Sequence, residues 1–434
     1  MSSEPVAVKE ATTYPRGFAK STDWKWPLVP ARQLVALNYG RALKADTRRP
    51  GEIPVYGTNG QCGWHDTLLA QGPGLILGRK GQGPLGVEWC PTNFWVIDTA
   101  YYATTLTHSV DLKYLYHLIK HVGLNHLKDG TSNPTLSRDV FGAQLFPLPS
   151  LCEQRAITEA LDTLDDRIAL LRETNATLEA IAQALFKSWF VDFDPVRAKQ
   201  QGLAPEGMDE ETAALFPDGF EESVLGLVPK GWRVCGFTET INVIGGGTPK
   251  TSVSEYWSGP LPWFSVVDAP ARSDVYVVDT EKHISELGLA NSSTKLLRPG
   301  TTIISARGTV GKLALTGCPM TMNQSCYGLQ GKADDSYFTY FTTCRLIEAL
   351  QQRAHGSVFD TITRDTLAGV SVTYPDPAII KDFERIVLPV MERIKENLEQ
   401  ARTLATLHDT LLPRLISGQL RLPDAEAQLE EATA

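Results

Sequence analysis

Residues 157–189 read ITEALDTLDDRIALLRETNATLEAIAQALFKSW, and this stretch decides the fold of the 434-residue chain. Its apolar residues recur at alternating intervals of three and four, which is typical of a coiled-coil seam rather than of a globular helix. At ~1.5 Å per residue, a helix from about 152 to 190 would be roughly 57 Å long. The expected seam positions are Leu161, Leu164, Ile168, Leu171, Asn175, Leu178, Ala182, Leu185 and Trp189.

The chain repeats itself at an interval of 226 positions. Asp166-Arg167-Ile168 returns as Glu392-Arg393-Ile394, and Arg138-Asp139 returns as Arg364-Asp365. A period this long indicates a duplicated domain. The same shift predicts a second, more polar seam at Val387, Val390, Ile394, Asn397, Ala401, Leu404, His408, Leu411 and Leu415. Pro389 should lie near the start of this helix and Pro413 near a kink, and the two helices could pair in parallel or antiparallel.

The segments around these helices are rich in strands. Short runs of β-branched and apolar residues alternate with Gly, Pro, Asn and Asp turns in residues 14–150 and 227–375. One helix is expected in each, over residues 113–121 and 337–353. The predicted fold class is α+β, with two strand-rich α/β domains separated by two long helices. The predicted parts are a first domain (1–150), a first long helix (151–191), an acidic Pro/Gly linker (192–226), a second domain (227–375), a second long helix (376–420) and a disordered acidic tail (421–434).

Composition sets limits on location and ligands. No apolar run approaches the ~20 residues of a membrane span, and residues 1–10 have no signal-peptide core, so a cytoplasmic protein without membrane contact is expected. The seven cysteines form no Cys-x-x-Cys pair, which argues against zinc. The net charge of −9 is uneven: residues 1–150 carry 15 basic and 11 acidic residues, whereas 151–226 carry 6 and 16. A basic face on each strand-rich domain is therefore compatible with an acidic chain.

No catalytic motif was identified. Gly81-Gln-Gly83-Pro-Leu-Gly86 matches a dinucleotide fingerprint in letters only, because a proline and a strand follow it instead of a helix. Asn133-Pro134-Thr135 lacks the second proline and the aromatic residue of an adenine-methyltransferase loop. The eight histidines show no metal-ligand spacing, and no paired carboxylates suggest a nuclease. We therefore expect no catalytic residue, no metal site and no cofactor in this chain.

The strand-rich domains instead carry side chains suited to DNA, placed in glycine-rich turns. Arg and Lys can pair with guanine edges and Asn and Gln with adenine edges. Each residue could equally be a solvated turn residue or a local cap. Arg138 and Arg364 in particular open helical turns, which favours a structural role for both. The candidates for DNA contact are Arg79, Lys80, Gln82, Asn93, Ser132, Asn133 and Thr135 in the first domain, and Thr248, Lys250, Arg307, Thr309, Lys312, Asn323, Gln324, His355 and Ser357 in the second.

Three motifs carry a family resemblance. They are ALFKSWFVDFDPVRAK at 184–199, LLPRLISGQL at 411–420 and GGTPK at 246–250. In this order, over almost the whole chain, they resemble the specificity subunit of type I restriction-modification systems. The first domain departs from the pattern, because Tyr39-Gly-Arg-Ala-Leu-Lys44 stands where a GGTP-like opening would be expected.

The resemblance implies two target-recognition domains, each reading one half of a bipartite site in double-stranded DNA, held apart by an antiparallel coiled coil. It also implies two modification subunits that bring S-adenosylmethionine, and two restriction subunits that use ATP and Mg²⁺. Two rival hypotheses remain: a coiled-coil adaptor without sequence-specific recognition, and a stand-alone methyltransferase or nuclease. The first predicts no salt-dependent duplex binding, and the second predicts activity of the purified chain alone.

Overall fold

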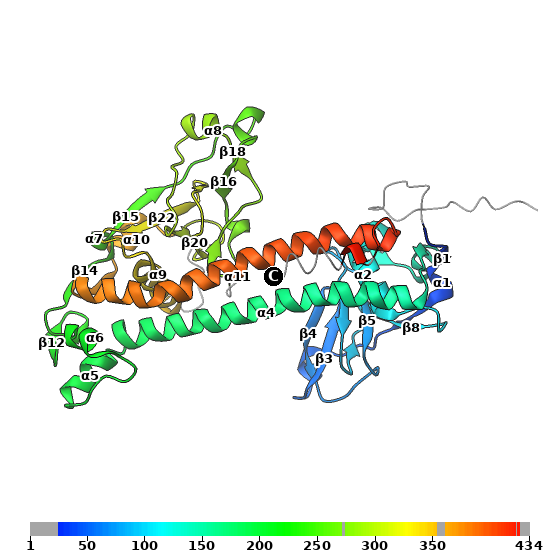
Figure 1. The fold of residues 1–434 in the computed structure, drawn as a ribbon, viewed down its shortest axis with the longest axis horizontal. Helices are drawn as coiled ribbons and strands as arrows, with labels where there is room; N and C mark the ends of the chain where they lie inside the picture. The colour runs from blue at the N-terminus through cyan, green and yellow to red at the C-terminus, as the bar shows by residue number, and fades with distance from the viewer. Residues whose placement is uncertain (1–24, 271–273, 354–360, 422, 426–434) are drawn as a thin grey trace, which may run out of the picture. The chain divides into compact units, whose positions relative to one another are not determined.

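The computed structural model of the chain describes residues 25–270, 274–353, 361–421 and 423–425. The chain forms two compact units. Unit 1 comprises the residues up to Arg167 together with those from Thr403 onward, and unit 2 is Ile168–Arg402. Both units contain strands and helices, which confirms the predicted α+β class (Figure 1).

Unit 1 is built on a four-stranded antiparallel sheet in the order β2-β8-β5-β6. These strands are Val35–Tyr39, Ala100–Thr105, Gly74–Gly78 and Val87–Cys90. A second sheet has the order β4-β3-β7, formed by Gly60–His65, Ile53–Gly57 and Trp95–Val96. Short pairs are made by β1 (Leu28–Pro30) with β11 (Leu145–Pro147) and by β9 (Lys128–Asp129) with β10 (Thr135–Leu136). The shorter helices are α1 (Ala31–Leu34), α2 (Leu112–Val122) and α3 (Arg138–Gly142).

Helix α2 was predicted from the sequence and is confirmed. The Asp111 side chain caps it by accepting hydrogen bonds from the backbone N–H groups of Lys113 and Tyr114. It packs against β5 and β6 and buries Leu115 and Leu118 completely. The core of unit 1 therefore lies between this helix and the four-stranded sheet.

Unit 2 repeats this plan with additions. Its main sheet has the order β15-β22-β19-β20-β17, and its second sheet has the order β18-β16-β21. The strands of these two sheets are β15 (Ile241–Gly245), β22 (Cys326–Gly331), β19 (Thr302–Ser305), β20 (Leu313–Thr316), β17 (Tyr276–Val277), β18 (His283–Ile284), β16 (Leu261–Phe264) and β21 (Thr321–Met322). Unit 2 also contains a strand pair, β14 (Arg233–Gly236) with β23 (Ser371–Tyr374). Its shorter helices include α7 (Phe237–Thr240), α8 (Glu286–Ala290), α9 (Ser336–Arg353) and α10 (Arg364–Ala368). Helix α9 confirms the second predicted short helix.

Matching pairs of strands establish the duplication at the level of register. In unit 1, β3 pairs in parallel with β7 through Val55 and Trp95. In unit 2, β16 pairs in parallel with β21 through Trp263 and Thr321. The predicted repeat is thus a repeat of topology, because corresponding strands have the same neighbours in the same direction.

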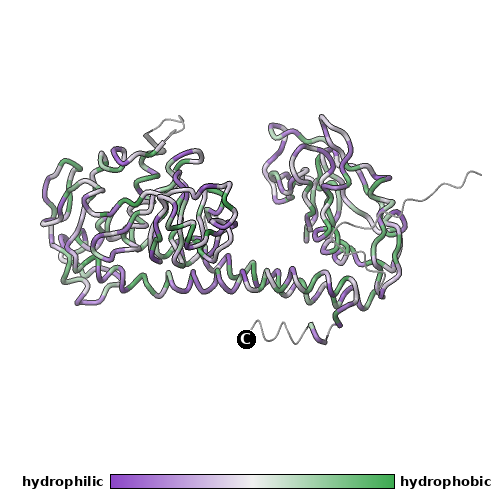
Figure 2. Tube along the Cα trace, turned by 90° about the horizontal axis from the view of Figure 1, so that it is seen from above, coloured by the Kyte–Doolittle hydropathy of each residue, from purple (hydrophilic) through white to green (hydrophobic). Residues whose placement is uncertain are grey.

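The two long helices are α4 (Leu151–Phe190) and α11 (Pro377–Ser417). In unit 2 their segments lie side by side and antiparallel (Figure 1), with Asn175 beside Ile394 and Asn397 and with Phe186 beside Phe383. Of the expected seam residues in unit 2, Ile168, Leu171, Asn175 and Ile394 are buried, and Leu178, Leu185 and Val390 are half-buried. In unit 1, Leu161, Leu164, Leu404, Leu411 and Leu415 are buried. Figure 2 shows purple, polar stretches alternating with green, apolar ones along the long helical part of the tube.

The expected start of the second long helix near Pro389 is wrong. Helix α11 begins at Pro377, where the missing N–H costs nothing because first-turn N–H groups have no partner in the helix. It continues through Pro389, whose neighbours Val387 and Met391 are buried. Tertiary packing of this apolar face offsets the backbone hydrogen bond that the proline removes.

The structure also differs from the expected linker at residues 192–226. This segment contains α5 (Asp194–Gln200), α6 (Glu210–Leu215) and the strand β12 (Phe220–Ser223), which pairs with β13 (Gly226–Pro229). Val196 and Phe216 are buried in an aromatic core with Trp189 and Trp232. Composition suggested a linker because acidic residues surround a few large apolar ones, and those few are the ones that pack. Of the predicted tail at 421–434, only 421 and 423–425 fall within the described residues.

In the described part of the chain, no helix is long and apolar enough to cross a membrane.

Candidate nucleic-acid interface

Two loops of unit 1 that hold predicted DNA-contacting residues are joined side by side. The loop between β5 and β6 contains Arg79, Lys80 and Gln82, and the segment leading into β10 contains Ser132, Asn133 and Thr135. Lys80 and Thr135 form an antiparallel bridge, and the Gln82 Nε2 donates to the Ser132 carbonyl over 2.8 Å. The backbone N–H of Leu136 donates to the carbonyl of Arg79 over 2.7 Å. We call these two segments the loop pair of unit 1.

Arg79 is held at the base of this loop pair by aromatic rings. Its guanidinium lies 4.8 Å from the ring centre of Tyr39 and 5.7 Å from that of Tyr101, and Nη1 donates to the Asp98 carbonyl over 2.9 Å. The guanidinium of Arg138 lies 4.6 Å from the same Tyr39 ring, which is half exposed. Stacking on aromatic faces fixes the plane of a guanidinium and leaves its edge for hydrogen bonds.

Lys80 is already paired within the chain. Its Nζ donates to the Asp98 carboxylate over 2.9 Å, and this hydrogen bond, with the positive charge, lowers the pKa of Asp98. A carboxylate beside a lysine reduces the net positive charge offered to a phosphate. The pair instead presents a donor and an acceptor side by side, which suits base edges better than the backbone.

Unit 2 has a loop pair of the same design. It consists of the loop after β19, which holds Arg307 and Thr309, and the segment leading into α10. Arg307 and Thr361 form an antiparallel bridge, as Lys80 and Thr135 do in unit 1, and the Ile362 N–H donates to the Ala306 carbonyl over 2.9 Å. Gly308 and Gly311 adopt the left-handed backbone that the tight turn requires. Arg307 and Thr309 are exposed at its tip.

Asn323 and Gln324 lie beside this second loop pair. The Ser325 carbonyl accepts a hydrogen bond of 2.7 Å from the Ala306 N–H, and the Gln324 side chain accepts one from the Thr248 hydroxyl. Thr248 belongs to the GGTPK segment. The structure therefore brings Thr248, Gln324 and Arg307 to one place in unit 2.

Asn93 does not share the position of Asn323. It follows β6, at the opposite end of the β5–β6 hairpin from Arg79, and its Oδ1 accepts from the Gly72 N–H over 3.1 Å. The true counterparts of Asn323-Gln324 are Ile97-Asp98. In unit 1 the Arg79 N–H donates to the Thr99 carbonyl over 2.9 Å, which is the same contact as Ala306 to Ser325. Asp98 could have been found from the sequence, since it lies 226 positions before Gln324.

The GGTPK segment and its unit 1 counterpart occupy equivalent backbone positions. A Cβ on Gly246 would lie 1.9 Å from the Asn323 carbonyl oxygen, and one on Gly40 would lie 2.1 Å from that of Ile97. Only glycine allows this approach of two backbones. Tyr39–Lys44 is thus the structural counterpart of Gly245–Lys250, although its sequence differs.

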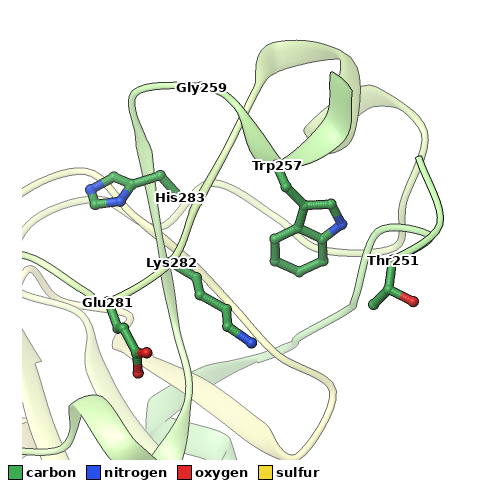
Figure 3. A pocket seen from close by; sticks show the side chains of 6 residues that line it. All are labelled: Thr251, Trp257, Gly259, Glu281, Lys282 and His283. Carbon is green, nitrogen blue, oxygen red and sulfur yellow. The ribbon is translucent and has the colours of Figure 1, made fainter. Parts of the chain in front are cut away.

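A cavity of about 600 Å³ adjoins the GGTPK segment in unit 2. Trp257 donates its indole N–H to the Lys250 carbonyl over 3.2 Å and packs edge-to-face on Trp263. The side chains of Trp257 and Lys282 reach into the same space, whereas His283 points away from it (Figure 3). An indole face beside an ammonium group suits a planar, electron-rich group such as a nucleobase with its phosphate.

The remaining candidates are spread more widely. Lys312 is exposed beside a cavity of about 440 Å³ that is also lined by Glu179 of α4 and by Asp274. Lys250, Ser132 and Asn133 are exposed in their loops. His355 and Ser357 lie outside the described residues. The interpretation of Arg138 and Arg364 as first residues of helical turns is confirmed, because Ser137 caps α3 and Thr363 caps α10.

Two repeated domains with paired loops and long helices define a class: proteins that present two related recognition surfaces on a helical scaffold. The family of the type I restriction modification DNA specificity domain matches this chain over residues 25–180 and 229–400. The chain belongs to that family and carries the domain twice.

Relatives support the assignment. The chain is 28% identical over 330 residues to the type I restriction enzyme HindI specificity subunit of Haemophilus influenzae, covering 66% of this chain and 71% of the relative. It is 30% identical over 322 residues to the MjaIX specificity subunit of Methanocaldococcus jannaschii, covering 72% and 70%. The crystal structure of a type I restriction-modification S subunit from M. genitalium covers 93% of this chain and 99% of its own at 17% identity, with a TM-score of 0.58, and shows the same fold. The predictions of a specificity subunit and of a non-catalytic role are confirmed by this family membership.

Proposed function

We propose that unit 1 and unit 2 each read one half of a two-part DNA site through their loop pairs. The observation that carries this proposal is a backbone bridge that recurs in both repeats, between Lys80 and Thr135 in unit 1 and between Arg307 and Thr361 in unit 2. We call this shared backbone arrangement the frame. The same frame presents different side chains, because Asp98 and Tyr39 in one repeat stand where Gln324 and Gly245 stand in the other. Two related surfaces with different chemistry suit two different half-sites.

The residues proposed to contact DNA fall into two groups. In unit 1 they are Arg79, Lys80, Gln82, Ser132, Asn133 and Thr135, joined by Tyr39 and Asp98. In unit 2 they are Thr248, Lys250, Arg307, Thr309, Lys312, Asn323 and Gln324, joined by Trp257 and Lys282 of the cavity. Asn93 is removed from the first group because it lies at the far end of its hairpin.

The partners of the chain follow from the same proposal. Two modification subunits would bring S-adenosylmethionine and methylate adenine in each half-site, and two restriction subunits would bring ATP and Mg²⁺. The specificity subunit would hold no cofactor and would act in the cytoplasm, where the DNA is. The helices α4 and α11 would separate the half-sites and dock the modification subunits.

The proposal is tested by co-expressing the chain with its modification subunit and mapping methylated adenines across the host DNA. A two-part motif with a fixed gap is expected. Exchange of residues 14–150 for those of a relative should change one half of the motif and leave the other half and the gap intact. The matched control exchanges residues 227–375 and should change the other half only.

A coiled-coil adaptor without sequence recognition gives a different result. It would form a stable complex with the modification subunit but leave no defined methylation motif. Duplex affinity of the complex that does not depend on sequence or on salt would support this rival, because DNA binding through Lys and Arg releases counterions and weakens as salt rises.

A further inference from the structure

Three potential metal ligands meet in unit 1, each from a different helix. They are His117 of α2, Asp165 of α4 and His408 of α11, and one ligand atom from each lies within 4.8 Å of the other two. All three lie in the part of α2, α4 and α11 that belongs to unit 1. The sequence did not predict this cluster, because motif searches look for ligands a few positions apart.

His117 is buried, and its hydrogen-bond partner identifies which ring nitrogen is the donor. Its side chain is 1% exposed, and Nε2 lies 2.9 Å from the Asp162 carboxylate, which Lys113 also contacts over 2.6 Å. Lys113 and His117 both face this carboxylate, which accepts hydrogen bonds, so Nε2 is the donor and Nδ1 is the ring nitrogen left with a lone pair. This buried Nδ1 has no hydrogen-bond partner among the described residues.

His408 has a similar arrangement. Its Nδ1 lies 3.2 Å from the Asp409 carboxylate, so Nδ1 is the donor and Nε2 is the ring nitrogen left with a lone pair. Nε2 is buried without a hydrogen-bond partner in the described part of the chain and lies 3.9 Å from Asp165 Oδ1. The ring centres of His117 and His408 are 6.2 Å apart.

His117 Nδ1 and His408 Nε2 are buried acceptors without a hydrogen-bond partner among the described residues, and both lie beside a carboxylate. This arrangement is unfavourable unless a cation binds there. A buried acceptor without a partner loses the hydrogen bonds that water gave it in the unfolded chain. The repeat shows that helix pairing does not need polar groups here. The positions 226 away from Asp165 and His408 are Met391 and Ala182, and both are buried in the apolar core of unit 2.

We propose that His117 Nδ1, His408 Nε2 and the Asp165 carboxylate bind one first-row divalent cation, with Zn²⁺ the best match. Two imidazoles and a carboxylate are among the ligands that zinc prefers, and bonds of about 2.0–2.2 Å would require the three groups, now within 4.8 Å of one another, to move closer together. Asp162 and Asp409 occupy the outer positions from which carboxylates orient metal-bound histidines. The cation would fasten α2 of the first recognition domain to both long helices.

The experiment uses Co²⁺ as a spectroscopic probe on the full chain, stripped of metal with a chelator and dialysed. One equivalent of Co²⁺ should produce visible d–d absorption and raise the thermal midpoint, and one equivalent of Zn²⁺ should displace it. His408→Gln and Asp165→Asn, whose side chains are partly exposed, should lose the absorption and the thermal shift while retaining the circular dichroism of the metal-free chain. Asp162→Asn should weaken the affinity about 10- to 100-fold.

His108→Ala is the matched control, since His108 is exposed in the same unit. It should bind Co²⁺ as the unchanged chain does. The proposal is overturned if the unchanged chain binds no stoichiometric Co²⁺ or Zn²⁺, or if His408→Gln and Asp165→Asn bind it with undiminished affinity. Methylation specificity plays no part in this readout, so failure of the proposed DNA recognition would leave it unaffected.

Discussion

Arg79, which we propose contacts DNA, is already held in place by its neighbours within the chain. Tyr39 and Tyr101 fix its plane, and the Asp98 carbonyl fixes one edge. A guanidinium held in this way has lost most of its rotamer freedom before it meets DNA. Its hydrogen bonds therefore contribute more to affinity than those of a freely moving arginine.

Replacing Arg79 should weaken and relax recognition of one half-site. Arg79→Ala should reduce specific affinity about 10- to 100-fold, which corresponds to the loss of one bidentate base contact. Arg79→Lys should not restore it, because an ammonium group lacks the planar fork. Fluorescence anisotropy of the complex with the modification subunit would measure this. Arg32→Ala is the control, since Arg32 is exposed at the opposite end of β2 from Tyr39; an equal loss there would contradict the assignment.

Glu384 gives the folding of unit 2 a defined pH dependence. Burial raises the pKa of Glu384 to about 8, and its Oε1 accepts a hydrogen bond from the Phe338 N–H over 2.7 Å. The folded chain keeps this proton when the unfolded chain has released it, so stability is full below pH ~4.5 and declines up to pH ~8. Glu384→Gln mimics the protonated acid and should remove this decline.

The expected gain from Glu384→Gln is about 1–3 kcal/mol above pH 8 and near zero at pH 4.5, after allowance for partial solvation. Thermal midpoints of the two chains between pH 5 and 9 would measure it. A difference that does not change with pH would contradict the assignment. Asp382→Asn is a control on the same helix, because the Asp382 carboxylate forms an ion pair with Arg385.

At the scale of the element, secondary structure was predicted best where apolar residues recur at strictly regular intervals. The 3–4 spacing located the seam because coiled-coil packing repeats every few residues. The strand pairs β3–β7 and β16–β21 could not be predicted, since they join short runs far apart in the chain and depend on tertiary context. The loop residues Arg79 and Thr135 were identified by chemistry, but their bridge was not. The repeat interval pairs Asn323 with Ile97, and residue type alone does not reveal that Asn93 lies at the other end of its hairpin.

Asn175 and Asn397 form the polar contact within the seam of unit 2. Asn397 Nδ2 donates to Asn175 Oδ1 over 2.9 Å, and Asn175 Nδ2 donates to the Ile394 carbonyl over 3.0 Å; both side chains are buried. Either single change to Leu should destabilise the chain by about 1–3 kcal/mol, because it leaves a buried polar partner unsatisfied. The double change should recover much of this loss. Urea unfolding of all four chains would measure the coupling; additive effects would contradict a direct interaction.

At the scale of the whole molecule, both long helices contribute to both units: α4 passes from unit 1 to unit 2 at Arg167, and α11 passes from unit 2 to unit 1 at Arg402. Insertion of one heptad into each helix at these points would add roughly 10 Å, or about three base pairs. If the helices set the gap between half-sites, the methylated motif should lengthen by that amount with both halves unchanged. Methylation mapping would show it, and methylation at the original spacing would argue against a ruler. An insertion in one helix only should disrupt pairing and abolish methylation.

The repeat interval itself has a consequence for how this protein changes over generations. Gly40 lies against the Ile97 carbonyl, and Gly246 lies against the Asn323 carbonyl in the same way. The two glycines are 206 positions apart in the sequence, whereas Ile97 and Asn323 are 226 apart. Unit 2 is therefore longer than unit 1 between these points, in the stretch that includes Trp257 and Lys282, and the shared backbone contact is kept. Because the backbone contact holds at both lengths, a change in this stretch can alter what one unit recognises and leave the other unit unchanged.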